Sequence, residues 1–105
     1  MLNLRNQCIV ITGGSSGLGL ELARHLAREG ARLTLIARDR DRLERAAQEL
    51  RAQPGGATVR IESLDIRDEA AAHACMQRIV AADGRIDMLI NSAGILREGR
   101  IESSP

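Results

Sequence analysis

Short apolar runs alternate with longer segments of helical period along most of the chain, and this alternation limits the fold more than any other feature. The first run, residues 8–11 (CIVI), is continuous and mostly β-branched, as expected for a strand that is buried on both faces. Apolar residues then recur at helical spacing from Gly19 to Leu26. Between the two lies a run of glycines and serines. The order strand, glycine-rich turn, helix is therefore expected at the start of the chain.

The same unit recurs twice more, and a fourth apolar run follows. Residues 33–37 and 57–61 are predicted strands, each followed by a helix with one apolar face, and residues 86–90 are the fourth predicted strand. The strand at 57–61 alternates apolar and polar residues, which suits the edge of a sheet. Strands joined by helices of this length pair in parallel through right-handed crossovers. We therefore predict an α/β fold, a doubly wound parallel sheet of about four strands in the order 3-2-1-4 with three helices.

Residues 1–105 form one predicted domain, because no linker or change of composition divides them. The tail ILREGRIESSP is polar and stops at Ser-Ser-Pro, a sequence typical of the start of a helix. We therefore expect the N-terminal part of a longer chain with an incomplete sheet. The alternative is a disordered natural terminus.

Composition argues against several classes of function. The net charge of +1 gives no bulk attraction to nucleic acid or to a membrane surface, and without Phe, Tyr or Trp there is no aromatic platform for bases. The two cysteines, Cys8 and Cys75, lie far apart and are predicted to be buried apolar residues, so no metal site is expected. The N-terminus lacks a long apolar segment and a cleavage site, which favours a cytoplasmic location.

The stretch VITGGSSGLG, residues 10–19, allows two chemically different interpretations. As G-x-S-x-G around Ser15, it matches the turn that carries the nucleophile of α/β-hydrolases. That site needs several preceding strands, then an acid and a histidine later in the chain. Only one strand precedes Ser15, and the two histidines, His25 and His73, lie within predicted helices. A serine hydrolase is therefore only a remote alternative.

As T-G-x-x-x-G-x-G, the same stretch is a turn whose free N–H groups bind phosphate at the N-terminus of a helix. Its position between the first strand and the first helix favours this interpretation, although glycines can also serve a tight turn alone. Gly13 and Gly17 can adopt backbone angles closed to other residues, and Gly19 lets the helix pack closely on the strands. We therefore predict a dinucleotide-binding domain of the Rossmann type. Its predicted contacts in this turn are Gly13, Ser15, Ser16, Gly17, Leu18 and Gly19.

The residues after the second strand bear on the choice of cofactor. An acidic side chain there binds the adenosine ribose of NAD, whereas a basic one accommodates the additional 2′-phosphate of NADP. We assign this phosphate to Arg38, supported by Arg42 one helical turn onward, because a guanidinium can bind phosphate bidentately. NADP is therefore predicted in preference to NAD. The alternative is a solvated helix start capped by Asp39, which could also turn toward a ribose.

Two further groups of residues follow the carboxyl ends of strands, where open α/β sheets bind ligands. Asp65 and Ile66 follow the third strand, and Asp65 could accept a hydrogen bond from the exocyclic amine of adenine. Alternatively, Asp65 caps a helix that begins near Arg67. The predicted contacts after the fourth strand are Asn91, Ala93 and Gly94.

Taken together, these residues resemble the short-chain dehydrogenase/reductase family of nicotinamide-dependent oxidoreductases. TGGSSGLG is similar to its T-G-x-x-x-G-x-G cofactor signature, and LDIRD is similar to its adenine-binding Asp site. NSAG is similar to its N-N-A-G element, with Ser92 in place of the second Asn. The resemblance implies ribose contacts from Asn91, Ala93 and the backbone. It also implies hydride transfer between NADP(H) and a small-molecule carbonyl or alcohol, and a homo-oligomer at full length.

The resemblance implies a catalytic Tyr and Lys after the fourth strand, and this chain contains neither residue type. We therefore predict no catalytic residue within these 105 residues, and no activity for them alone. The alternative function is a catalytically inactive dinucleotide-binding or partner-binding module. To a lesser degree, ITGGSSGLG, LIARDRDRLE and RIDMLINSAG resemble 3-ketodihydrosphingosine reductases and 3-oxoacyl-carrier-protein reductases.

Overall fold

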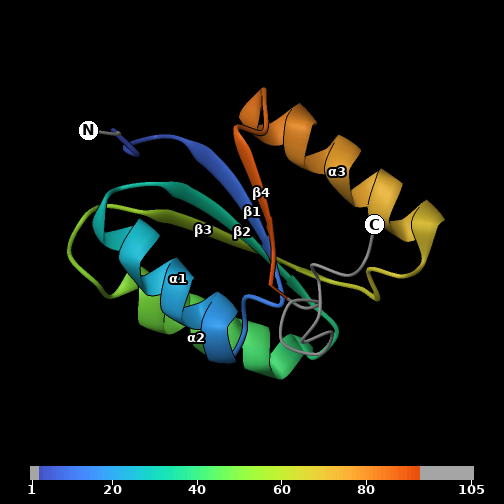
Figure 1. The fold of residues 1–105 in the computed structure, drawn as a ribbon, viewed down its shortest axis with the longest axis horizontal. Helices are drawn as coiled ribbons and strands as arrows, with labels where there is room; N and C mark the ends of the chain where they lie inside the picture. Colours follow the sequence, from blue (N-terminus) through green and yellow to red (C-terminus); the bar gives the residue numbers. More distant parts are fainter. Residues whose placement is uncertain (1–2, 93–105) are drawn as a thin grey trace, which may run out of the picture.

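A computed structural model of the chain describes residues 3–92, in which strands and helices alternate strictly (Figure 1). The elements are β1 (Cys8–Thr12), α1 (Gly17–Arg28), β2 (Arg32–Ala37), α2 (Arg40–Arg51), β3 (Thr58–Ser63), α3 (Glu69–Asp83) and β4 (Met88–Asn91). The α/β fold predicted from the sequence is confirmed.

The four strands form one parallel sheet in the order β3-β2-β1-β4, as predicted. In its register, Val10 of β1 lies between Thr34 of β2 and Leu89 of β4. Figure 1 shows α1 and α2 on one face of the sheet and α3 on the other. All five residues of the central strand β1 are buried, which explains its uninterrupted apolar sequence.

The core consists of two layers of unequal size, one on each face of the sheet. Ile9 and Ile11 of β1 point to the α1 and α2 side, in a cluster of 12 buried residues. Val10 points to the opposite side, where the cluster formed within residues 3–92 has four buried members, the others being Ile36, Cys75 and Ile79. Side chains alternate between the faces because the strand period is two residues. The larger layer therefore fixes α1 and α2, and the smaller one fixes α3.

Two strand boundaries differ by two residues from the sequence prediction, and the other strand ends agree within one residue. β3 continues to Ser63, past the predicted end at residue 61, because its polar residues still pair with β2 and the Leu64 N–H donates to the Ala37 carbonyl at 2.9 Å. β4 begins at Met88, two residues later than predicted. Before it, Asp87 accepts a hydrogen bond from the Cys8 N–H through its carboxylate at 2.7 Å. The Asp87 N–H in turn donates to the Cys8 carbonyl at 2.8 Å, so Asp87 bonds to Cys8 through both its side chain and its backbone just before β4 begins.

A buried carboxylate joins α3 to the two strands beside it. The Asp83 side chain is only 3% exposed, and its Oδ1 lies 3.0 Å from Arg32 of β2 and 2.6 Å from Arg60 of β3. No feature of the sequence pattern indicated this cluster, because its members lie far apart in the chain. None of the helices among residues 3–92 combines the length and apolar character needed to cross a membrane.

The Asp83→Asn variant is expected to lower the free energy of unfolding by about 2 kcal/mol, because it leaves two partly buried guanidinium groups without their anion. The change keeps the side-chain volume and removes only the charge. Urea denaturation measures the effect. The control is Glu44→Gln, which breaks an exposed pair with Arg40 and should cost less than about 0.5 kcal/mol. Equal losses of unfolding free energy in the two variants would show that the buried cluster stabilises the fold no more than an exposed ion pair does.

Candidate nucleotide-binding site

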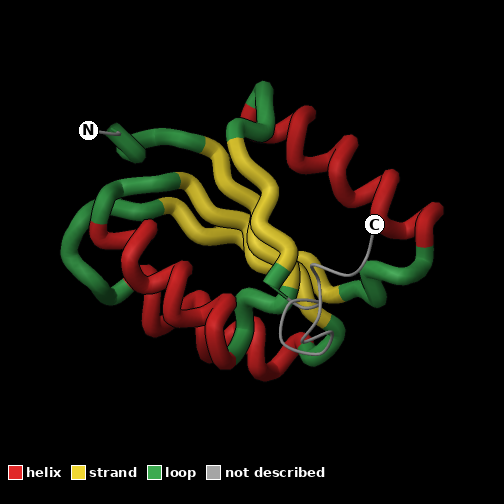
Figure 2. Tube along the Cα trace, viewed as in Figure 1, coloured by secondary structure: helices red, strands yellow, loops and turns green. Residues whose placement is uncertain are grey.

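A cleft of about 390 Å³ lies at the carboxyl ends of the strands. Figure 2 shows the loops after β1, β2 and β3 gathering at this end of the sheet. The cleft is lined by Thr12, Gly13, Ile36, Ala37, Arg38, Leu64, Asp65, Ile66, Arg67 and Asn91. The loops of a parallel sheet form such a cleft where neighbouring strands send their connections to opposite faces.

The glycine-rich turn between β1 and α1 forms one wall of the cleft. Gly13 has a φ of 74° and donates its N–H to the Ile36 carbonyl at 2.7 Å, which fixes the turn to β2. Gly17 has a φ of 57°, a conformation that residues with a side chain rarely adopt. Of the other predicted residues of the turn, Ser15 is buried, and Ser16 and Leu18 are exposed. The positive φ values account for the glycines at positions 13 and 17.

Gly19 has a different role, which is close packing. A Cβ atom at this position would lie 2.1 Å from the carbonyl oxygen of Gly13 and 2.5 Å from Oγ of Ser92. The first turn of α1 therefore approaches both the glycine turn and the end of β4 more closely than any side chain permits. The close packing predicted for Gly19 is what the structure shows.

The N-terminus of α1 is prepared for an anion in a way that the other two helices are not. Asp39 and Asp68 cap α2 and α3, and each of these helices also carries an acidic residue in its first turn. Within residues 3–92, no side chain caps α1 at Ser16, and its first turn contains no acidic residue. Its free N–H groups and positive dipole end therefore remain available. Beside them, apart from the chain neighbours of Gly17 and the backbone of α1 itself, no described atom lies within 4 Å of a Cβ placed on Gly17.

The end of β4 is tied to the end of β1. The Ser92 hydroxyl donates to the carbonyl oxygen of Thr12 at 2.6 Å, and the Thr12 hydroxyl donates to Oδ1 of Asn91 at 2.7 Å. Ser92, which departs from the N-N-A-G pattern, therefore bonds to the backbone within the protein. Asn91 lines the cleft, and within residues 3–92 its amide NH₂ group has no hydrogen-bond partner and can donate to a ligand. The predicted contacts Ala93 and Gly94 lie outside the described residues.

Arg38 lies in the cleft, whereas Arg42 does not. The Arg38 side chain is 70% exposed, and its Nη1 is 3.7 Å from Oδ2 of Asp65. Asp39 caps α2 by accepting the N–H of Arg42 at 3.1 Å, which is the alternative that the sequence left open for this aspartate. The Asp39 carboxylate is therefore engaged in capping α2. Arg42 is not among the described residues that line the cleft, so the structure gives no support to its predicted role.

Asp65 lines the cleft and forms a turn with Arg67. Its Oδ1 accepts the backbone N–H of Arg67 at 3.0 Å and the side-chain Nε at 3.1 Å, while Oδ2 accepts Nη2 at 3.0 Å. These bonds lower the pKa of Asp65 to about 2, so the carboxylate is ionised at neutral pH. The alternative role as a helix cap is wrong, because α3 begins later and Asp68 caps it.

Sequence reasoning missed two polar residues of the cleft, Thr12 and Arg67. Arg67 was considered only as the start of a helix. An Asp side chain often accepts the backbone N–H of the residue two positions later, so the spacing of Asp65 and Arg67 is typical of such a turn. Thr12 was noted only as part of the glycine signature, yet its hydroxyl orients Asn91. Both roles depend on local hydrogen bonds that residue types alone do not specify.

The arrangement does not assemble a hydrolase site. His25 is exposed on α1, with Nε2 at 3.4 Å from Glu21, and His73 is exposed on α3. Neither histidine bonds to Ser15 within residues 3–92. In the same described part of the chain, no three His, Cys, Asp or Glu side chains come together in a way that could hold a metal ion.

Comparison with known proteins identifies the family. Residues 7–104 match the family model of the short chain dehydrogenases, and the chain belongs to this family. Human dehydrogenase/reductase SDR family member 13 is 40% identical over 100 residues, which cover 95% of this chain and 26% of the relative. The family was recognised correctly from the sequence, and its members are oxidoreductases that bind NAD or NADP.

Solved structures agree with this assignment. L-sorbose reductase from Gluconobacter frateurii, complexed with NADPH and L-sorbose, superimposes with a TM-score of 0.77 at 34% identity, covering 83% of this chain and 33% of that one. NAD⁺-bound xylitol dehydrogenase superimposes with a TM-score of 0.78 at 28% identity, covering 84% of this chain and 33% of that one. The chain therefore spans about a quarter to a third of the length of these proteins.

Proposed function

We propose that this chain is the NADP(H)-binding part of a short-chain dehydrogenase/reductase that transfers hydride to a carbonyl or from an alcohol. The observation that carries the proposal is the placement of Arg38 in one cleft with the glycine turn that leads to the uncapped N-terminus of α1. Arg38 suits a phosphate on the adenosine ribose, and the N-terminus of α1 suits a pyrophosphate.

The residues of the cleft fit the successive parts of such a dinucleotide. The first turn of α1 provides N–H donors for the pyrophosphate, and Gly17 leaves room for its oxygens. Asp65 is an ionised acceptor for the exocyclic amine of adenine. Asn91 provides an amide at the far side of the cleft for a ribose hydroxyl. The nicotinamide supplies the hydride, and these residues bind and orient it.

Arg38, and not the fold, is the feature that favours NADP over NAD. Structures similar to this one include a protein bound to NADPH and a protein bound to NAD⁺, so the shared fold accommodates both cofactors. Arg38 offers a cation where an NAD-specific site would hold an acid. The acid that follows it in the sequence, Asp39, is engaged as the cap of α2.

The intact protein that carries this chain is expected to bind NADP⁺ about tenfold more tightly than NAD⁺, because only NADP⁺ gains a charge-assisted contact with Arg38. Isothermal titration measures both affinities, and NADPH absorbance in the presence of a panel of ketones and aldehydes then reports turnover. Binding without turnover of any carbonyl or alcohol would favour the inactive dinucleotide-binding module. Binding of neither cofactor would contradict the proposal.

The substrate and the partners are proposed at the level of chemical class. A small-molecule carbonyl or alcohol and a homo-oligomeric assembly follow from membership of the family, and size-exclusion chromatography with light scattering tests the assembly. The cytoplasmic location stays a prediction, as does the particular substrate among the reductase classes that the sequence resembles.

A further inference from the structure

Asp65 lies between two guanidinium groups that reach the same carboxylate oxygen. Nη2 of Arg67 is 3.0 Å from Oδ2, and Nη1 of Arg38 is 3.7 Å from it. Arg38 follows β2 and Arg67 follows β3, so the three side chains form a bridge across one end of the cleft. Two cations and one anion leave the bridge with a net charge of +1.

The two arginines are held very differently. Arg67 binds both carboxylate oxygens through its side chain and one of them again through its backbone N–H, at 3.0 to 3.1 Å. Within residues 3–92, the Arg38 side chain has only the 3.7 Å approach to Oδ2, which is longer than a hydrogen bond. The negative charge of Asp65 is therefore compensated by Arg67, and Arg38 keeps its donors.

We propose that Arg67 is a specificity-determining residue: by pairing with Asp65 it leaves Arg38 to bind the phosphate on the adenosine ribose of the cofactor. The inference rests on the proposed function, because it assumes that a phosphorylated dinucleotide occupies the cleft. It assigns a role to a residue that does not itself need to touch that phosphate.

When Arg67 is absent, the carboxylate of Asp65 loses the cation that compensates its charge. An unpaired carboxylate near Arg38 competes with the ligand for the guanidinium, and it also repels the phosphate. The bridge then has no net charge. The 2′-hydroxyl of NAD carries no charge, so its binding is far less sensitive to the change. Arg67 therefore acts on the ratio of the two affinities.

The Arg67→Gln variant of the intact protein is expected to lower the ratio of NADP⁺ affinity to NAD⁺ affinity about fivefold, the upper range for an exposed charge pair. Isothermal titration with both cofactors gives the ratio, in which any general loss of adenine binding cancels. Arg67→Lys keeps the positive charge but loses the planar guanidinium that binds both carboxylate oxygens, and it should retain most of the ratio. The Arg67 side chain is 71% exposed, so both variants are expected to remain folded.

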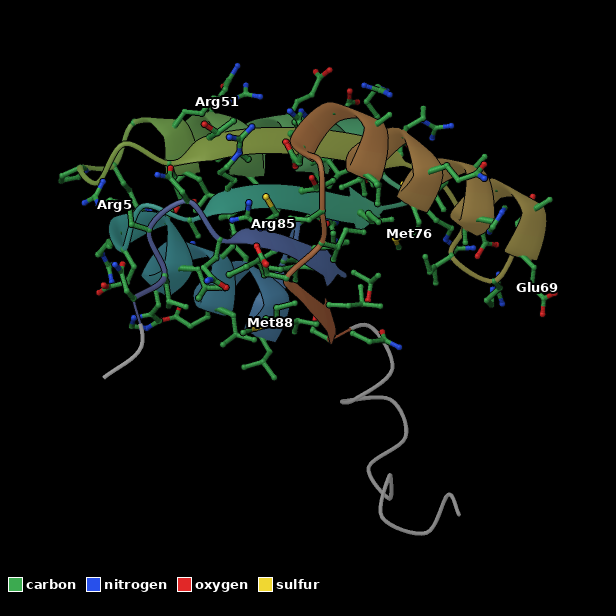
Figure 3. All side chains as sticks on the ribbon, turned by 90° about the horizontal axis from the view of Figure 1, so that it is seen from above. Arg5, Arg51, Glu69, Met76, Arg85 and Met88 are labelled. Carbon is green, nitrogen blue, oxygen red and sulfur yellow. The ribbon has the colours of Figure 1, made fainter. Side chains whose placement is uncertain are left out.

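The chain provides a matched control at the opposite end of the sheet. Arg85, labelled in Figure 3, bonds to Asp87 two residues later through Nε at 3.0 and 2.9 Å, where β1 and β4 begin. This pair has the same residue types and the same spacing as the pair of Asp65 with Arg67, in reverse order. Arg85→Gln removes the same charge far from the cleft and should leave the ratio unchanged.

A double variant separates the mechanism from a direct contact. In Asp65→Asn with Arg67→Gln, the competing carboxylate is absent as well, and the ratio is expected to return to within about twofold of the wild-type value. A ratio that stays low in the double variant would show that Arg67 touches the phosphate itself, which overturns the proposal. An unchanged ratio in Arg67→Gln also overturns it. Failure of the wild-type protein to bind either cofactor would instead contradict the proposed function.

Discussion

Replacing Gly19 with alanine is expected to lower the free energy of unfolding by at least about 3 kcal/mol and to abolish cofactor binding. The new methyl group would lie 2.1 Å from the Gly13 carbonyl oxygen, which is backbone and cannot rotate away. Relief requires that α1 move off the sheet or that the glycine turn rearrange. Either movement displaces the N–H groups that would bind the pyrophosphate. Thermal and urea unfolding measure the stability, and titration with NADP⁺ measures the binding.

Gly17→Ala is the informative comparison for Gly19. At Gly17 the added methyl group meets no described atom within 4 Å outside its chain neighbours and the backbone of α1, and the φ of 57° is what opposes it. The expected cost is about 1 kcal/mol, the strain of a left-handed residue. If the two variants were equally destabilised, close packing would not be the reason for the glycine at position 19.

Arg38→Asp is expected to lower the affinity for NADP⁺ about a hundredfold and to leave that for NAD⁺ unchanged or improved. The substitution replaces a donor to the 2′-phosphate with an anion that repels it, while a carboxylate can accept from the two hydroxyls of an unphosphorylated ribose. Because the Arg38 side chain is 70% exposed, the fold should tolerate the change. Titration with both cofactors measures the reversal.

The control for Arg38 must change the net charge equally at a distance from the cleft. Arg45→Asp does so on the exposed face of α2. It should weaken NADP⁺ binding by less than about twofold at physiological salt, because Arg45 does not line the cleft and salt screens exposed charges. Similar losses in both variants would mean that the protein attracts NADP⁺ through its general charge and not through Arg38.

The sheet order and the glycine turn could be predicted because each depends on a local pattern with a strong physical cause. Uninterrupted apolar residues mark a strand buried on both faces, as in β1, and positive φ values demand glycine at positions 13 and 17. The extension of β3 through Glu62 and Ser63 could not be predicted in this way. These polar residues belong to an edge strand, where pairing with β2 does not require an apolar side chain.

The parts of the site that were missed depend on which polar groups meet. Asp65 was correctly placed beside the cleft, but the sequence does not specify that Arg67 would occupy both of its oxygens. Likewise, Asp83 meets Arg32 and Arg60 only through the folded sheet. Many arginines and acids in this chain offer alternative pairs of similar energy, and only the backbone positions select among them.

The unequal thickness of the two core layers has a consequence for how the cleft responds to a ligand. Ile66 packs against the small cluster on the α3 side, whereas Gly14 of the glycine turn lies against Leu35 of the large cluster beneath α1 and α2. Local opening costs least where few apolar contacts must be broken. The side of the cleft that carries Asp65 and Arg67 is therefore expected to open locally at a lower free-energy cost than the glycine turn. A dinucleotide would meet a fixed surface at its pyrophosphate and an adaptable one at its adenosine, and binding would slow the exchange of amide hydrogens mainly around the start of α3.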